Sequence, residues 1–501
     1  MTDPDISKTI AQFLQKAIQM NLIDSIDEIY FRNRLIDYLE LEDYSEPTDL
    51  HSIPDLLDSM DALIDYAIQN EIIGDYQYKK DIFEAKIMNL VTPLPSTLNN
   101  NFWEKYKENK EEATDYFYQL SQQNNYIKTR NIAKNIFFET RSPYGNLEIT
   151  INLSKPEKDP KEIAAQRDQV STNYPSCVLC LENEGYKGHA SHAARENHRI
   201  IRMKIQDEIY GMQYSPYVYY NEHSIFLNEI HKPMVVDRTA IENLLEIIDV
   251  LPHYFVGSNA DLPIVGGSIL SHDHYQGGRY QFPIEEAKRI EEVKLVDYPT
   301  VEASIVQWPL SVLRLKSENK EDLVQAVVHI MDTWRNYSDR EFDIVSHTGD
   351  TRHNTVTPIA RFNKGLYEMD VVLRNNRTTE EYPDGIFHPH PDVHHIKKEN
   401  IGLIEVMGLA ILPPRLVGEL QELEDYLLNK KTLSEVSAVH QDWAEELKEE
   451  KDLFDEATVS EYIKQKVGDK FTRVLEDAGV FKQTEKGIQG FKKFVDSLNK
   501  N

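Results

Sequence analysis

Apolar residues recur at helical spacing near the N-terminus of the chain. With Ser7 as a suitable N-cap, the i, i+3, i+4, i+7 pattern of an amphipathic helix is followed by Ile10, Phe13, Leu14, Ala17 and Ile18. The acidic segment from 37 to 58 contains Pro47 and Pro54 and has the composition of a loop between helices. We therefore expect residues 1–125 to form a helical N-terminal region.

From about residue 126 the period of the apolar positions changes to two. Apolar and polar residues alternate over 147–153, between Gly145 and Pro156, which predicts a strand. The other elements expected in this part are strands at 217–220, 224–227 and 254–256, and a helix over 241–248 that begins near Thr239 and ends before Pro252. Together they predict a mixed α/β half over residues 126–300.

A second run of the same type follows, with strands over 304–315, a helix over 323–331 and a strand over 367–373. A diverged internal duplication is one interpretation, although periodicity alone does not prove it. We expect a second half over residues 301–415 and, after Pro413-Pro414, a helical region over 416–501. The predicted fold class is α+β, with antiparallel-rich sheets, packed helices and helical extensions at both ends, which suits a chain of 501 residues.

The charge balance restricts the partners. The chain has 55 Lys and Arg against 84 Asp and Glu, a net charge of −29, which disfavours a nucleic acid partner. An anionic substrate must therefore be held by local donors inside a cleft. The first ten residues lack the features of a signal peptide, and no run of about 18 apolar residues occurs, so we expect a cytoplasmic protein without a membrane partner.

The segment from Gly266 to Gly278 carries the most chemistry. If its centre is extended, His272, His274 and Gln276 project from one face. A neutral imidazole can attack phosphorus and hold a transferable group, whereas Gln276 cannot protonate a leaving group. That combination favours a leaving group that needs no proton, such as a sugar 1-phosphate, whose second pKa is about 6. A bare HxH is also typical of a metal site or of two core histidines, but the paired glycines on both sides favour phosphate chemistry.

Cys177 and Cys180 have the spacing of half a tetrahedral zinc site, although a redox pair or two unrelated thiols would share that spacing. Downstream histidines can supply the other two ligands. His231 and His272 are the candidates, with His223 as a nearby competitor of His231. Such a closed site would fix the strand that carries the nucleophile without competing for substrate.

The histidine segment resembles the active-site strand of the galactose-1-phosphate uridylyltransferases, the transferase branch of the histidine-triad superfamily, whose pattern is HxHxQ after a Gly/Ser-rich turn. The strings that are similar to the longer bacterial class are GGSILSHDHYQGG, HNTVTPIAR, GLYEMDVVLRNN and HPHPDVHHIKKENIGLIEVMG, and the similarity runs over most of the chain. The resemblance implies two histidine-triad-like halves and a structural zinc. It also implies that His274 is the nucleophile, that Gln276 steadies the uridylylated phosphate, and that Asn259 and Ser268 contact phosphate or imidazole.

Further substrate contacts follow from the same resemblance. Arg130 and Asn131 are expected to contact phosphate or uridine. Asn354 and Arg361, together with Arg352, are expected to form a second cluster that lines the cleft. The residues expected to reach the hexose or its phosphate are Lys397, Lys398, Asn400 and Glu405. The histidine-dense segment 387–395 is either a metal site or a solvated loop. Where the better-known class carries a late HxH strand for a second metal, this chain has Glu368 and Asp370, which makes a second metal doubtful.

The reaction implied is transfer of a uridylyl group from UDP-glucose to galactose 1-phosphate through a covalent uridylyl-histidine, with glucose 1-phosphate and UDP-galactose as the products. The resemblance also allows a homodimer. Two alternatives stay open at this point. One is a dinucleotide phosphorylase or nucleotide hydrolase of the same superfamily, and the other is a non-catalytic zinc protein that binds nucleotide sugars.

Overall fold

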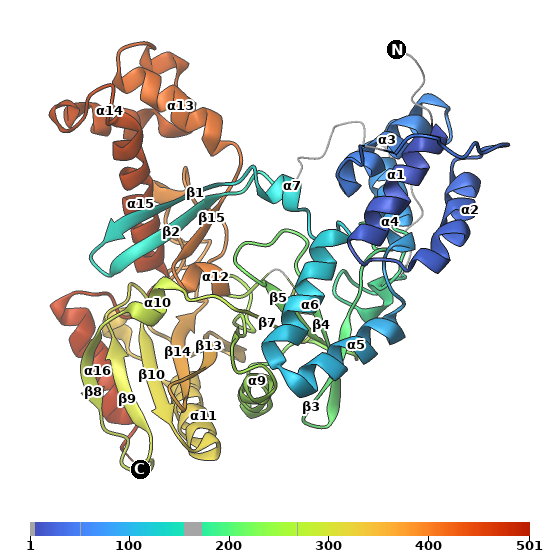
Figure 1. Cartoon of the computed structure of the whole chain (residues 1–501). Coiled ribbons are helices and arrows are strands. Elements are labelled where there is room, and N and C mark those ends of the chain that lie inside the picture. Colours follow the sequence, from blue (N-terminus) through green and yellow to red (C-terminus); the bar gives the residue numbers. More distant parts are fainter. Residues whose placement is uncertain (1–5, 51, 155–172, 268, 501) are drawn as a thin grey trace. The chain divides into compact units, whose positions relative to one another are not determined.

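The computed structural model describes residues 6–50, 52–154, 173–267 and 269–500 (Figure 1). The chain divides into two compact units. The first comprises Met1–Arg130, Lys155–Val218 and Ser224–His231, and the second comprises Asn131–Ser154, Tyr219–His223 and Lys232–Asn501. This division follows spatial compactness, whereas the four regions expected from the sequence follow the type of element and stay a prediction.

The first unit begins with helices. They are α1 (Ile6–Gln19), α2 (Glu28–Tyr38), α3 (Leu56–Gln69), α4 (Gln77–Leu90), α5 (Pro95–Glu108) and α6 (Lys110–Gln123), followed by the short α7 (Thr129–Ile132). Ile10, Phe13 and Leu14 are fully buried in the core of this unit, as the spacing predicted. The helix already includes Ser7, so the predicted N-cap was wrong by at least one residue.

Three strands complete the first unit, namely β3 (Ile201–Ile205), β4 (Glu208–Tyr214) and β5 (Ser224–Asn228), which pair antiparallel in that order. Helix α5 is tied to β3 at Arg202, whose N–H donates to Asn99 Oδ1 (2.7 Å) and whose carbonyl accepts from Trp103 Nε1 (3.1 Å). Residues 217–220 form bends rather than the predicted strand. Tyr220 of this segment is buried, so the aromatic residues that suggested a strand are explained by burial of a side chain in an irregular segment.

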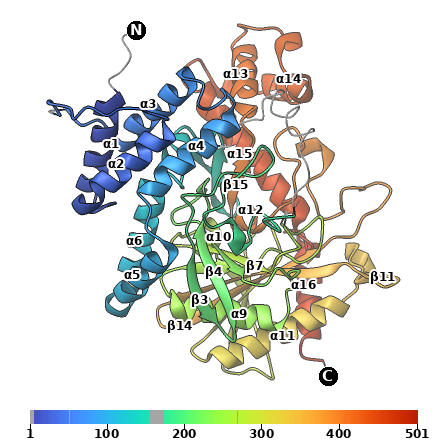
Figure 2. The same cartoon turned by 90° about the vertical axis from the view of Figure 1, so that its right-hand side faces the viewer.

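Seven antiparallel strands form the main sheet of the second unit. In spatial order they are β7 (His274–Gly278), β6 (Phe255–Gly257), β13 (Asn354–Asn363), β14 (Leu366–Asn375), β10 (Val312–Ser317), β9 (Glu302–Val306) and β8 (Arg289–Val293). Helices α9 (Arg238–Val250) and α11 (Lys320–Asn336) pack against each other and against β13 (Figure 2). Helix α9 is capped by Asp237, whose side chain accepts from Ala240 N (3.1 Å), and not by the predicted Thr239.

The same succession of elements occurs twice along the chain. Strands β3, β4 and β5, helix α9 and strands β6 and β7 come first, and β8, β9, β10, α11, β13 and β14 repeat that order apart from the short hairpin β11 (His347–Thr348) and β12 (Thr351–Arg352). This repetition supports the diverged duplication. The fold class is α+β, with antiparallel-rich sheets as expected.

A smaller sheet of β1 (Ile136–Ser142), β2 (Gly145–Ile151) and β15 (Leu409–Leu412) lies beside α15 (Val459–Ala478) (Figure 1). The alternating residues Leu147, Ile149 and Ile151 of β2 are buried, so the predicted strand is confirmed. The remaining helices of the second unit are α10 (Pro283–Glu286), α12 (Leu403–Val406), α13 (Leu416–Leu427), α14 (Gln441–Glu449) and α16 (Glu485–Ser497).

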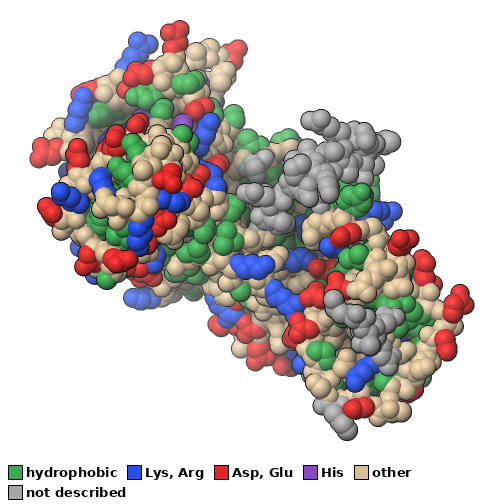
Figure 3. All heavy atoms as spheres, turned by 90° about the horizontal axis from the view of Figure 1, so that it is seen from above, with side chains coloured by type: hydrophobic (Ala, Val, Ile, Leu, Met, Phe, Trp, Pro, Cys, Tyr) green, Lys and Arg blue, Asp and Glu red, His purple; other side chains and the backbone are tan. Residues whose placement is uncertain are grey.

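Acidic and basic side chains are interspersed over the face shown in Figure 3, so the excess negative charge is not confined to one segment there. Among the described residues, no helix has both the length and the apolar composition needed to cross a bilayer.

Candidate active site

The candidate nucleophile opens a buried strand. Strand β7 pairs with β6, with Gln276 opposite Gly257 and Gly278 opposite Phe255. His274 is the first residue of β7, and His272 lies before it. The expected one-face arrangement therefore applies to His274 and Gln276, which are two residues apart in one strand, and not to His272.

A backbone hydrogen bond fixes the ring of His274. Its Nδ1 lies 2.7 Å from the carbonyl oxygen of His272. Because a carbonyl can only accept, Nδ1 carries the proton and Nε2 keeps its lone pair. Burial is the largest influence on this ring and lowers the pKa of His274 below its usual value. The imidazole is therefore neutral near pH 7, with one nitrogen ready to act as a nucleophile.

A second histidine orients Gln276. His223 Nε2 lies 3.1 Å from Gln276 Oε1, and burial lowers the pKa of His223 to about 4. The neutral His223 thus donates to the amide oxygen, which leaves the amide N–H groups of Gln276 facing away from it as donors. The Tyr220 ring packs against His223 in a tilted arrangement, with centroids 4.4 Å apart. The sequence offered His223 only as a competing metal ligand, and no local pattern could indicate this contact.

The glycines before β7 permit close packing. A Cβ on Gly266 would lie 2.4 Å from the carbonyl oxygen of Ala260, and one on Gly267 would lie 2.8 Å from Asn259 Nδ2. Asn259 is buried, and its Oδ1 accepts from Leu403 N (2.9 Å) at the start of α12. Its predicted contact with phosphate or imidazole stays a prediction. Ser268 lies outside the described residues.

The four predicted metal ligands come together. Ligand atoms of Cys177, Cys180, His231 and His272 all lie within 4.8 Å of one another. The two Sγ atoms are 3.4 Å apart, and Cys180 Sγ is 3.2 Å from His231 Nδ1. Zinc bonds of about 2.0–2.3 Å give tetrahedral edges of about 3.3–3.8 Å, so these donors fit a structural ion. His223 contacts Gln276 and is not in this group.

The surroundings of this Cys/His cluster hold its ligands in place. Asp273 N donates to the carbonyl of Lys232 (2.7 Å), which aligns the residues that follow His272 and His231. Asn183 Nδ2 donates to the carbonyls of both cysteines, at 2.8 and 2.9 Å. Burial, followed by the hydrogen bond between the two thiols, raises the pKa of Cys180, so a thiolate at this position requires a nearby cation.

Arg130 and Asn131 lie in α7. The Arg130 guanidinium contacts three carboxylates of the first unit, those of Asp55 (3.3 Å), Asp58 (2.5 Å) and Asp61 (2.8 Å). Asn131 Oδ1 accepts from Lys134 Nζ (3.5 Å). The two residues stay predicted substrate contacts, with Arg130 engaged by carboxylates in this structure.

Asn354 is fully buried and caps the end of α11, where its Nδ2 donates to the carbonyls of Trp334 (2.6 Å) and Tyr337 (2.8 Å). These contacts satisfy two carbonyl groups at the C-terminal end of α11. The substrate contact of Asn354 stays a prediction.

Arg361 lies within a buried charge network. Its Nη2 is 2.8 Å from Asp370 Oδ2 and contacts Glu368, and Arg314 Nε donates to Asp370 (2.7 Å). Lys316 also contacts Glu368. The two carboxylates considered for a second metal thus have cationic side chains as partners, and the substrate contact of Arg361 stays a prediction.

The segment 387–400 is irregular, as its prolines indicated. Lys397 is buried and pairs with Glu405 (3.0 Å), and Asn400 Oδ1 lies 3.2 Å from His388 Nε2. Lys398 is exposed and lines a separate pocket. The hexose contacts of Lys398 and Asn400 stay predictions.

Two family models match the chain. Galactose-1-phosphate uridyl transferase, N-terminal domain, matches residues 21–233, and the C-terminal domain of the same description matches residues 247–445. The chain is 52% identical over 495 residues to the galactose-1-phosphate uridylyltransferase of Lactococcus lactis subsp. lactis (strain IL1403) and 48% identical over 496 residues to that of Clostridium perfringens (strain 13 / Type A), with 99% of each chain covered in both cases.

Among solved structures, yeast Ap4A phosphorylase is 14% identical with a TM-score of 0.29, over 63% of this chain and 93% of that chain, and no inference rests on that likeness. The two family models and the identities over the full length show that the chain belongs to the galactose-1-phosphate uridylyltransferase family.

Proposed function

We propose that this protein transfers a uridylyl group from UDP-glucose to galactose 1-phosphate through a covalent intermediate on His274. The observation that carries the proposal is the hydrogen bond from His274 Nδ1 to the carbonyl of His272, which leaves Nε2 unprotonated in a buried site. The family membership supplies the substrates, because the relatives are named for this activity.

The reaction has two balanced displacements. His274 Nε2 attacks the α-phosphorus of UDP-glucose, and the bond from that phosphorus to the bridging oxygen breaks, so glucose 1-phosphate leaves with the electron pair. Galactose 1-phosphate then attacks the uridylyl phosphorus through a phosphate oxygen, and the N–P bond breaks to return neutral His274. Neither leaving group needs a proton, which suits a site where Gln276 occupies the third position.

Gln276 and His223 would act together on the transferring group. With its oxygen held by His223, Gln276 presents amide N–H groups that can donate to phosphoryl oxygens as charge develops. In this scheme Gln276 contacts the reacting atoms, and His223 is a positioning residue.

The Cys/His cluster would hold zinc. Two thiolates and two imidazoles in a closed group of four are the donor set that structural zinc sites use, and a bound ion would stabilise the segment that leads into β7. Metal analysis of the parent protein and of the Cys177→Ser and Cys180→Ser variants tests this assignment. We expect one equivalent of zinc in the parent and loss of zinc in both variants, and a parent without stoichiometric zinc would contradict the proposal.

Intact-protein mass spectrometry tests the covalent intermediate. Incubation with UDP-glucose alone should add the mass of one uridylyl group, and later addition of galactose 1-phosphate should remove it. His274→Ala should show no adduct, whereas His347→Ala, a control at an exposed position in β11, should behave as the parent. No adduct in the parent would overturn the covalent scheme.

The same experiment separates the alternatives. An adduct that water removes as fast as galactose 1-phosphate would indicate a hydrolase, and one that forms only from dinucleotides would indicate a phosphorylase. A protein that binds UDP-glucose without any adduct would match the non-catalytic alternative. The cytoplasmic location, the homodimer and the lack of nucleic acid and membrane partners stay predictions from the sequence.

A further inference from the structure

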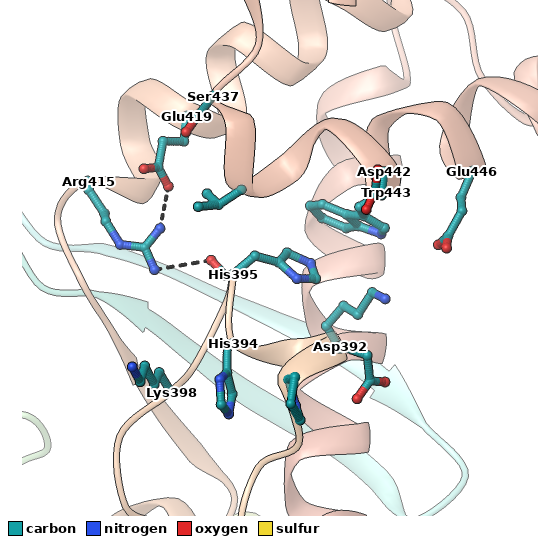
Figure 4. A pocket seen from close by; sticks show the side chains of 13 residues that line it. Asp392, His394, His395, Lys398, Arg415, Glu419, Ser437, Asp442, Trp443 and Glu446 are labelled. Carbon is teal, nitrogen blue, oxygen red and sulfur yellow. Dashed lines mark hydrogen bonds and ion pairs between the residues drawn. The ribbon is translucent and has the colours of Figure 1, made fainter.

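A pocket of about 640 Å³ opens in the second unit, and Lys398 alone among its lining residues belongs to the predicted substrate contacts. It lies between the segment 391–398 and helices α13, α14 and α15, and neither His274 nor Gln276 lines it (Figure 4). Its volume is within the range of small-molecule sites, about 300–1,000 Å³. Apart from the contact predicted for Lys398, the reaction proposed above assigns no role to this pocket.

Five charged side chains in the pocket have no charged partner. Among the described residues, no ion pair within 4.0 Å involves Lys398, Lys470, Asp392, Asp442 or Glu446. These lysines and carboxylates thus line the same cavity without forming ion pairs with each other. A ligand that offers acceptors to the lysines and donors to the carboxylates would satisfy both sets.

The charges are arranged around His395. Figure 4 shows Arg415 and Lys398 on one side of His395, and Asp392, Asp442 and Glu446 on the other. Arg415 donates to the carbonyl of His395 (3.1 Å) and pairs with Glu419 (2.5 Å). The pocket therefore has a cationic end and an end rich in hydrogen-bond acceptors.

Aromatic rings form the wall between these ends. The rings of His395 and Trp443 lie 5.1 Å apart, and His440 packs beside both. Burial lowers the pKa of His395 to about 3, so this ring is neutral and adds no charge. Trp443 is 4% exposed, so it bounds the pocket without offering a face for stacking, and the carboxylates beside it can accept from the hydroxyl groups of a sugar.

We propose that this pocket is a second, non-catalytic site for a monophosphorylated sugar. The phosphate would lie at the end formed by Lys398 and Arg415, and the sugar hydroxyls would face Asp442 and Glu446. Inorganic phosphate would leave the carboxylates without hydrogen-bond donors, and an uncharged sugar would leave the lysines without an anionic partner. The proposal goes beyond the transfer reaction, because binding here requires no chemistry at His274.

Tryptophan fluorescence gives a local readout. The chain has four tryptophans, of which Trp308 and Trp334 are fully buried and Trp103 lies in the first unit, so Trp443 is the one that lines the pocket. Glucose 1-phosphate should cause a saturable change that persists when uridine monophosphate is present to occupy the uridylyl site. Trp443→Phe should abolish the change.

Matched variants test the two ends. Lys398→Met should weaken the affinity by about tenfold or more, the size expected for a lost charge-assisted contact, whereas Lys364→Met in the exposed turn between β13 and β14 should not. Glu446→Gln should weaken binding, and Glu445→Gln, an exposed neighbour outside the pocket, should not. Circular dichroism of each variant checks the fold.

The proposal is overturned if glucose 1-phosphate gives no saturable change, if uridine monophosphate abolishes it, or if Lys398→Met and Lys364→Met respond alike. Inorganic phosphate or an amino acid that binds as tightly as glucose 1-phosphate would refute the sugar as the ligand class. A protein that lacks transferase turnover but shows the fluorescence change would refute the proposed function and leave this site standing.

Discussion

Replacing Arg361 with methionine should destabilise the second unit. Arg361 is 4% exposed and neutralises Asp370 and Glu368, which it shares with Arg314 and Lys316. Methionine keeps much of the aliphatic volume and removes the charge. Two buried carboxylates would then depend on one guanidinium and one ammonium group.

The magnitude follows from burial and from the remaining partners. Removing one partner of a buried ion pair costs about 3–5 kcal/mol, because the other charge is left in a medium of low dielectric. Since Asp370 keeps its ion pair with Arg314 and Glu368 keeps its ion pair with Lys316, we expect a loss of unfolding free energy at the lower end of this range, about 3 kcal/mol. Arg238→Met is the control, because its pairs with Glu242 and Glu321 are exposed to solvent and such pairs contribute little to stability.

Urea unfolding followed by tryptophan fluorescence measures this effect, because Trp308, Trp334 and Trp443 all belong to the second unit. Arg361→Met should unfold at a clearly lower urea concentration than the parent and Arg238→Met should not. If Arg361→Met unfolds like the parent while the KM for UDP-glucose rises, the buried network is unimportant and Arg361 is the substrate contact that the sequence predicted.

Three further outcomes are expected. His223→Leu should lower kcat about tenfold, because Gln276 loses its orienting donor, and should keep the metal content; loss of metal would return His223 to the ligand set. Burial raises the pKa of Glu148 from 4.5 to about 7, so its stabilising contribution is complete below pH 4.5 and lost as pH rises through 7. Glu148→Gln should therefore flatten the dependence of the melting temperature on pH in that window, and an unchanged slope would contradict this. Gly418→Ala in α13, where a Cβ meets nothing within 4 Å, should raise the unfolding free energy by about 0.5–1 kcal/mol, and a loss would refute the open space.

Elements with clear periodicity could be predicted from the sequence. The strand over 147–153 and the helix over 323–331 were found because their buried residues recur at periods of two and 3.6. The strand predicted over 217–220 was wrong, because aromatic residues are common both in strands and in buried irregular segments. Helix starts were misplaced by one or two residues, since Asp237 and Thr239 are both acceptable caps.

Part of the site could be predicted because its chemistry is local. The Cys-x-x-Cys spacing and the HxHxQ segment each fit within a few residues. The partners of Arg361, Asn354 and His223 could not be predicted, because Asp370, Trp334 and Gln276 are brought to them by pairing of strands and packing of helices. Their side chains are polar and chemically suited to substrate binding. Only the folded structure shows that Arg361 pairs with a buried carboxylate, that Asn354 caps a helix and that His223 orients Gln276.

The hydrogen bond between the ring of His274 and the carbonyl of His272 has a consequence for the product of the first half-reaction. Phosphohistidines exist as two positional isomers, and a free imidazole in water can yield both. With one ring nitrogen tied to the backbone, this protein should form a single isomer, bonded through Nε2. Nitrogen-15 labelled histidine would distinguish the two by NMR, and its spectrum would report directly on how firmly one peptide carbonyl directs the chemistry.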